Sequence, residues 1–215
     1  MYPYSILIDL ESCDGGITPT KWQKKLFPKA YQGKIKVLHE GINTSICKPD
    51  KSTTVHIEDK GLTLGINDEV ITYGTRGMEE YRGFPQFMKA LEILQKKRPK
   101  MHAIIAGADK VFYGQENISY KEEMKNELDL DMSRIHFTGV IPFESYIGIL
   151  QISSAHIYLT YPMMLSWSLL NAMSTGCCIV ASDTNPVKEF ITDNQNGLLT
   201  DFFDTNSLVE KIEFA

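Results

Sequence analysis

Cysteine, histidine and long apolar runs are all scarce in this sequence of 215 residues. Its four cysteines are Cys13, Cys47, Cys177 and Cys178, and none has the Cys-x-x-Cys spacing of a metal or redox motif. The five histidines stand far apart in the sequence, which argues against a metal cage. We therefore expect reduced cysteines that behave as small apolar side chains, and no bound metal.

Charge of one sign is not concentrated in any segment. The net charge is −5, and the 22 basic residues are scattered along the chain, so a nucleic-acid surface is not expected. A local phosphate site stays open, because it needs only one or two cations. No stretch approaches the roughly 18 apolar residues of a membrane helix, and the first residues lack the pattern of a signal peptide. We expect a cytoplasmic protein without a membrane span, and a peripheral membrane contact of a longer enzyme stays open.

From residue 72 onward, short apolar runs alternate with amphipathic stretches, which is typical of βαβ units around a parallel sheet. Strands are predicted over 70–73, 102–106, 135–138, 156–160 and 178–182. Helices are predicted over 85–97, 120–128, 145–152, 165–175 and 185–191. Gly176 should cap the fourth helix in a left-handed conformation. The predicted fold class is α/β, a Rossmann-like parallel sheet with helices on both faces.

The first fifty residues follow a different pattern. A short helix opens within 18–23, a strand covers 35–38, a polar connector covers 41–50 and a hairpin covers 55–66. A helix and a strand isolated by such a connector cannot bury their own apolar faces. We therefore divide the chain into residues 1–49, a remnant of a preceding domain with its connector, and residues 50–215, a Rossmann-like domain.

A glycine-bearing segment after the 70–73 strand is the strongest candidate for chemistry. It contains Gly74, Arg76 and Gly77, and Arg82 and Gly83 then open a helix. A loop that leads into a helix N-terminus offers unpaired N–H groups to a phosphate, and arginines add forked donors. The alternative is a solvated turn with surface arginines. Neither G-x-G-x-x-G nor G-x-x-x-x-G-K-[ST] occurs, so the NAD and P-loop interpretations lose their main support.

A second candidate lies where the 156–160 strand ends and a helix begins near Ser166. Ligands of open α/β sheets bind at the carboxyl edge of the strands. Trp167 and Asn171 are four residues apart and share a helix face that can look into a cleft. The alternative is a core helix with a single polar position.

These segments together resemble the C-terminal domain of glycosyltransferase family 4, the retaining "group 1" enzymes whose GT-B fold joins two Rossmann domains. Residues 36–43 resemble the interdomain strand "V-I-x-N-G-I-D", and 74–83 resemble the donor-phosphate motif "G-R … K-G". Residues 136–140 resemble "F-x-G-x-V", whose following loop meets the base. Residues 170–176 resemble "L-E-A-M-A-x-G", and 196–199 resemble "N-G-L-L". The resemblance runs from about residue 18 to about residue 207.

The resemblance implies transfer of a hexose from a UDP- or GDP-sugar to a glycan, a lipid or another acceptor, with retention and without a metal, as in polysaccharide biosynthesis. Arg76 and Arg82 would neutralise the diphosphate leaving group. Backbone amides near Ser166 and Trp167 would complete the diphosphate cradle. The other positions expected to contact the donor are Gly74, Val140, Ile141, Met163 and Asn171.

The sequence departs from the family pattern at two positions where glutamates are usual, which are Met163 and Asn171 here. Asn171 can still form hydrogen bonds with ribose hydroxyls, whereas Met163 cannot replace a carboxylate. The leading interpretation is the donor-binding half of a glycosyltransferase, active only with an upstream acceptor domain. The alternative is a non-catalytic nucleotide-sugar-binding or scaffold protein. A sugar-nucleotide epimerase of the same fold lacks support, because no carboxylate pair or histidine is arranged for proton abstraction.

Overall fold

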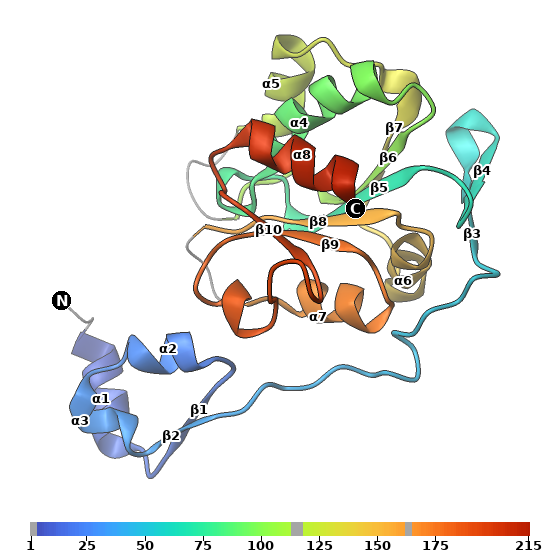
Figure 1. Cartoon of the computed structure of the whole chain (residues 1–215). Coiled ribbons are helices and arrows are strands. Elements are labelled where there is room, and N and C mark those ends of the chain that lie inside the picture. Colours follow the sequence, from blue (N-terminus) through green and yellow to red (C-terminus); the bar gives the residue numbers. More distant parts are fainter. Residues whose placement is uncertain (1–3, 113–117, 162–164) are drawn as a thin grey trace.

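The computed structural model describes residues 4–112, 118–161 and 165–215. A six-stranded sheet forms its centre, and all neighbouring strands in it are parallel (Figure 1). The strands are β5 (Val70–Gly77), β6 (His102–Ala108), β7 (Ile135–Gly139), β8 (Ala155–Tyr158), β9 (Ile179–Ser182) and β10 (Leu198–Thr200). Their order across the sheet is β10-β9-β8-β5-β6-β7. The predicted parallel α/β fold is confirmed.

Helices cover both faces of the sheet, as Figure 1 shows. One face carries α4 (Phe84–Lys97), α5 (Tyr120–Glu127) and α8 (Thr205–Phe214), and the other carries α6 (Phe143–Gln151) and α7 (Trp167–Ser174). Side chains of β5 alternate between the two layers. Ile71 and Tyr73 pack in the core beneath α4 and α8, whereas Val70 packs with α6 and a hairpin of β3 (Thr54–Ile57) and β4 (Leu62–Gly65). Among the described helices, none is long and apolar enough to cross a membrane.

The order of the strands reverses between β5 and β8. From β5 the chain adds β6 and β7 on one side, and then returns to add β8, β9 and β10 on the other. The chain leaving β5 enters α4 on one face, and the chain leaving β8 enters α7 on the opposite face. Because these two connections diverge, a crevice opens at the carboxyl ends of β5 and β8.

Three predicted elements differ from the structure. Strand β5 continues to Gly77 instead of ending at Tyr73, so Gly74 and Arg76 lie in an irregular strand extension and not in a free loop. Helix α7 begins at Trp167, two residues later than predicted, because Ser166 is extended (φ −106°, ψ 155°). The helix predicted over 185–191 is wrong. Only a 3-10 turn forms at Val187–Glu189, since Phe190 leaves the helical region with φ −121°.

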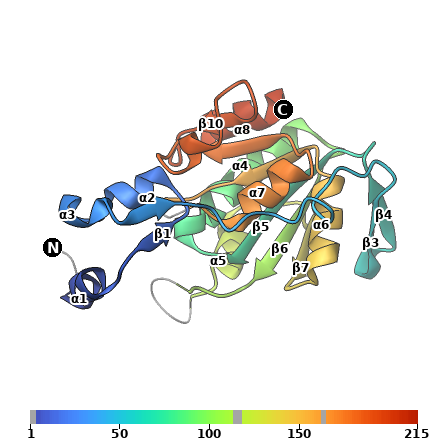
Figure 2. The ribbon, with the colours of Figure 1, turned by 90° about the horizontal axis from the view of Figure 1, so that it is seen from below.

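The N-terminal part forms a small unit of its own with α1 (Tyr4–Ser12), β1 (Gly16–Thr18), α2 (Lys21–Lys25), α3 (Lys29–Gln32) and β2 (Ile35–Val37). The predicted short helix and the 35–38 strand are confirmed, and β2 pairs with β1 in parallel. Helix α1 and strand β1 were not predicted. Ile17 and Leu38 leave apolar side chains exposed on this unit. Residues 39–53 then run across α7 and α6 to the hairpin (Figure 2).

A carboxylate from the main sheet domain caps helix α2. Glu189 accepts hydrogen bonds from the backbone N–H groups of Lys21 (2.8 Å) and Trp22 (2.5 Å). The hydroxyl of Thr20 accepts from the N–H of Gln23 at 3.0 Å, and the carbonyl of Thr20 accepts from Lys24. Side chains therefore satisfy the amides of the first three helical residues, and the Lys24 bond begins the regular helix ladder. Two of these three side-chain bonds come from a residue about 170 positions later in the chain.

We expect Glu189→Ala to loosen α2 without unfolding the sheet domain. Removing a helix cap costs about 1 kcal/mol, which corresponds to roughly fivefold faster amide hydrogen exchange. The measurement is hydrogen exchange at residues 21–25 by mass spectrometry. Glu210→Ala, which removes the same charge from an exposed position on α8, is the control. Equal protection of residues 21–25 in the two variants would contradict this role of Glu189.

Candidate functional site

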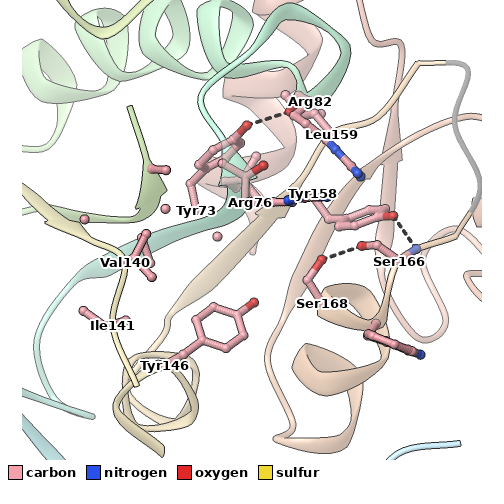
Figure 3. A pocket seen from close by; sticks show the side chains of 18 of the residues that line it. Tyr73, Arg76, Arg82, Val140, Ile141, Tyr146, Tyr158, Leu159, Ser166 and Ser168 are labelled. Atoms are coloured by element: carbon pink, nitrogen blue, oxygen red, sulfur yellow. Dashed lines mark hydrogen bonds between the residues drawn. The ribbon is translucent and has the colours of Figure 1, made fainter. Parts of the chain in front are cut away.

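A cavity of about 680 Å³ opens at the carboxyl edge of the sheet, where the strand order reverses (Figure 3). Its walls come from the ends of β5, β6, β7 and β8, and from the beginning of α7. The predicted site residues that line it are Gly74, Arg76, Arg82, Val140, Ile141, Ser166 and Trp167. Segments about 90 residues apart in the sequence therefore meet in one cavity, as the carboxyl-edge argument predicts.

Glycines let the walls of this cavity approach one another closely. A Cβ at Gly74 would lie 2.6 Å from Cε2 of Tyr146, which packs against the strand there. Gly107 has a φ of +142°, and a side chain on it would collide with the carbonyl oxygen of Thr75. Substitution at either position would therefore push apart the strand ends that shape the cavity.

The two predicted arginines line the same cavity from neighbouring segments. Arg76 is exposed on β5, and its guanidinium carbon lies 4.2 Å from the centre of the Phe112 ring. Arg82 ends the 3-10 turn at Glu80–Arg82, and its side chain is 17% exposed. Its Nε lies 3.9 Å from Oε1 of Glu79 and makes no hydrogen bond with any described residue. The structure thus places two cations, one of them largely buried, on one wall.

The beginning of α7 forms the facing wall. The Ser166 N–H donates to the Tyr158 hydroxyl at 3.1 Å, and the hydroxyls of Ser166 and Ser168 lie 2.6 Å apart (Figure 3). Neither serine hydroxyl caps the helix. The amides of Trp167 and Ser168 therefore find no acceptor in the described part of the chain. An unsatisfied helix N-terminus beside two arginines can bind an anion.

The connection between β7 and α6 supplies an apolar wall. Gly139 turns the chain with a φ of +66°, and Val140 and Ile141 follow. Val140 is 81% exposed, whereas Ile141 is half-buried against the core beneath α6. An apolar wall of this kind suits a flat ring better than a phosphate.

Tyr146 of α6 is a cavity residue that sequence reasoning missed. Its hydroxyl is buried and has no hydrogen-bond partner among the described residues. Burial raises the pKa of Tyr146, so the hydroxyl keeps its proton and can donate it. Buried hydroxyls nearly always have partners. In the sequence, an aromatic residue on an amphipathic helix is indistinguishable from a core residue, so no signal pointed to it.

Of the two remaining predicted donor contacts, the structure describes only Asn171, and it does not bring this residue to the cavity. Asn171 is 7% exposed and lies beneath the connector, where its Oδ1 accepts from the thiol of Cys47 at 3.4 Å. Ser174 fixes that connector from α7 by donating its hydroxyl to the Cys47 carbonyl. The ligand contact of Asn171 stays a prediction. Met163 lies outside the described residues, so its predicted contact also stays a prediction.

A parallel sheet with two arginines and a helix N-terminus at its reversal point defines a Rossmann-type domain whose crevice has the chemistry to receive an anion. The chain belongs to the group 1 glycosyltransferases. The family model described as "Glycosyl transferases group 1" matches residues 60–215, and one described as "Glycosyl transferase family 4 group" matches residues 3–47. The resemblance noted in the sequence is therefore confirmed.

Individual relatives share the fold over most of this chain. HepE of Anabaena, solved with UDP and glucose, has a TM-score of 0.79 at 18% identity, covering 98% of this chain and 55% of its own. Sucrose-phosphate synthase of Thermosynechococcus elongatus has a TM-score of 0.75 at 18% identity, covering 95% and 49%. The uncharacterised glycosyltransferase MJ1069 of Methanocaldococcus jannaschii is 34% identical over 122 residues, which are 56% of this chain and 29% of MJ1069. The chain thus spans less than two thirds of the length of each of these relatives.

Two of the cavity tyrosines, Tyr146 and Tyr158, should respond differently to loss of the hydroxyl. Tyr146→Phe removes a buried group without a described partner, so we expect an unchanged melting temperature or a rise of up to about 2 °C. Tyr158→Phe deprives the Ser166 N–H of its acceptor and should lower the melting temperature by about 2–4 °C. Calorimetric melts of the two variants test this. A larger loss in Tyr146→Phe than in Tyr158→Phe would show that Tyr146 has a structural partner.

Asn171→Glu should destabilise the protein. The new carboxylate would lie beneath the connector, where the thiol of Cys47 is its only described partner, and an unpaired buried charge costs several kcal/mol. We expect a melting temperature about 10 °C lower. Asn126→Glu, the same change at an exposed position of α5, should leave the melt unchanged. Equal melts for the two variants would mean that position 171 is open to water.

Proposed function

We propose that this chain is the donor-binding part of a glycosyltransferase that uses a UDP- or GDP-sugar. The observation that carries the proposal is the convergence on one cavity of Arg76, Arg82 and the first amides of α7, which have no acceptor among the described residues. A diphosphate is the part of such a donor that needs cations and N–H donors. As the glycosidic bond breaks, negative charge builds on the diphosphate, and fixed donors that stabilise this charge lower the barrier.

The shape of the cavity supports a nucleotide in a defined direction. Val140 and Ile141 form the apolar wall at one end, where a base can lie flat. Arg82 and Ser166 lie toward the other end, where the diphosphate would meet them. Tyr146 lines the cavity with a hydroxyl that has no partner in the described part of the chain and can donate to the bound nucleotide. The family and the UDP-bound relative HepE support the same ligand class.

Further parts of the proposal rest on family membership and on the shape of the site. The reaction retains the anomeric configuration, moves a hexose to a glycan, lipid or other acceptor in the cytoplasm, and needs no metal. An acceptor domain preceding this chain supplies the second wall of the cleft. Apolar exposure of Ile17 and Leu38 on the small N-terminal unit supports such a neighbour.

The runner-up is a protein of this family that binds a nucleotide sugar without turning it over. It is favoured by Asn171, which stands at the position of a family glutamate and lies beneath the connector. Both functions need the same donor site. They differ in whether a chain extended by its acceptor domain releases free UDP or GDP from the sugar nucleotide in the presence of acceptors.

Arg82→Ala should weaken binding of UDP or GDP by about ten- to a hundredfold, because a charge-assisted hydrogen bond contributes roughly 1.5–3 kcal/mol. Tyr146→Phe should weaken it by about fivefold, as expected for a neutral hydrogen bond. The measurement is titration calorimetry in EDTA. Lys89→Ala, which removes a cation from the exposed face of α4, should bind like the wild type.

Two outcomes would count against the donor site. One is an affinity of Arg82→Ala equal to that of Lys89→Ala. The other is a complete loss of nucleotide binding in EDTA that a divalent metal restores, since the arginines would then not be the principal cations of the site.

A further inference from the structure

Glu79 is a buried carboxylate that connects both arginine-bearing parts of the cavity wall. Its side chain is 2% exposed and lies between β5 and the turn that carries Arg82. Its Oε2 accepts the backbone N–H of Phe112 at 2.8 Å, and its Oε1 lies 3.9 Å from Nε of Arg82. Carboxylates are seldom buried unless they are paired. Glu79 lies behind the cavity lining, so these contacts act on the site from outside it.

The contact with Phe112 extends the influence of Glu79 to Arg76. The guanidinium carbon of Arg76 lies 4.2 Å from the centre of the Phe112 ring, in a cation–π arrangement. The ring also packs against β5 itself, because a Cβ at Gly77 would lie 2.6 Å from Cδ2 of Phe112. Glu79 therefore contacts Arg82 directly with its side chain. It also fixes the backbone of Phe112, whose ring lies against the guanidinium of Arg76.

The balance of two opposing effects decides what Glu79 does for an anionic ligand. Ordering long arginine side chains before binding removes an entropy cost from the binding step. The negative charge of Glu79 also repels a diphosphate and partly neutralises Arg82. The geometry favours ordering. The closest approach of the Arg82 guanidinium to Glu79 is through Nε, and no hydrogen bond joins that guanidinium to another described residue, so its terminal nitrogens stay available to a ligand.

We propose that Glu79 is a positioning residue that orders Arg76 and Arg82 together for the diphosphate of the ligand. The inference rests on the proposed function for the identity of that ligand. It predicts that loss of Glu79 weakens binding of the diphosphate and spares binding of the nucleoside, since the arginines meet only the phosphates.

The test compares UDP with uridine, or GDP with guanosine if the wild type binds the guanine nucleotide. Calorimetry measures the diphosphate and NMR titration measures the nucleoside. Glu79→Gln keeps an oxygen for the Phe112 N–H and loses the charge beside Arg82, so diphosphate affinity should fall about tenfold. Glu79→Ala loses both contacts and should bind still more weakly. Glu80→Gln removes the same charge at the exposed neighbouring position and should match the wild type.

A double-mutant cycle isolates the connection through Phe112. Phe112→Leu keeps the backbone N–H and removes the ring under Arg76, so diphosphate affinity should fall about threefold. Phe112→Leu should lower diphosphate affinity by the same factor in the Glu79→Gln background, because the glutamine oxygen still accepts the Phe112 N–H. It should vanish in the Glu79→Ala background, where Arg76 has already lost its support.

Three results would overturn the positioning role. Tighter diphosphate binding by Glu79→Gln would mean that Glu79 mainly neutralises Arg82. Equal losses for diphosphate and nucleoside would mean that Glu79 only stabilises the fold. An unchanged diphosphate affinity in Phe112→Leu would show that Phe112 does not link Glu79 to Arg76. This measurement decides the question if the Glu79 variants no longer unfold cooperatively and their affinities cannot be interpreted. A wild type that binds neither UDP nor GDP would instead overturn the proposed function.

Discussion

The chain leaves β5 and β8 toward opposite faces of the sheet, although the two strands are hydrogen-bonded neighbours. Two connections that diverge in this way leave a space between them, so a cavity forms at the carboxyl ends of the strands. Its position follows from the order β10-β9-β8-β5-β6-β7 alone. The side chains that line it then determine which ligand it can hold.

Close packing around Arg82 shows how the sequence gives this cavity its charge. The carbonyl of Arg82 accepts from the Tyr73 hydroxyl at 2.8 Å, and Tyr73 itself stacks on Phe87 of α4. Gly83 follows in a left-handed conformation (φ 69°), and a side chain there would collide with Leu159. The core thus fixes the backbone on both sides of the arginine, and Glu79 contacts its side chain. The energetic cost of holding a cation at the cavity is met during folding and not during binding.

The sequence was sufficient for the features that depend on local pattern. Alternating apolar runs predicted the parallel sheet, and the placement of Arg76 and Arg82 before a helix predicted that both would lie at one site, where phosphate binding stays a prediction. Features that depend on distant partners were not predictable. The Tyr146 hydroxyl, the burial of Asn171 beneath Cys47, and the Glu79 contact with Phe112 each join segments at least 30 residues apart. The cap that the Glu189 carboxylate places on α2 was not predictable for the same reason.

Binding of a nucleoside diphosphate at the β5–β8 reversal point is the central claim, and NMR mapping tests it most directly. In a titration of the ¹⁵N-labelled chain with UDP and GDP, the amides of Gly74, Gly107 and Gly139 and the indole of Trp167 should shift together, because all four residues line the cavity. The amide of His102, where β6 begins at the opposite edge of the sheet, should not move. Saturable shifts confined to that opposite edge, or no shift with either nucleotide at millimolar concentration, would contradict the account.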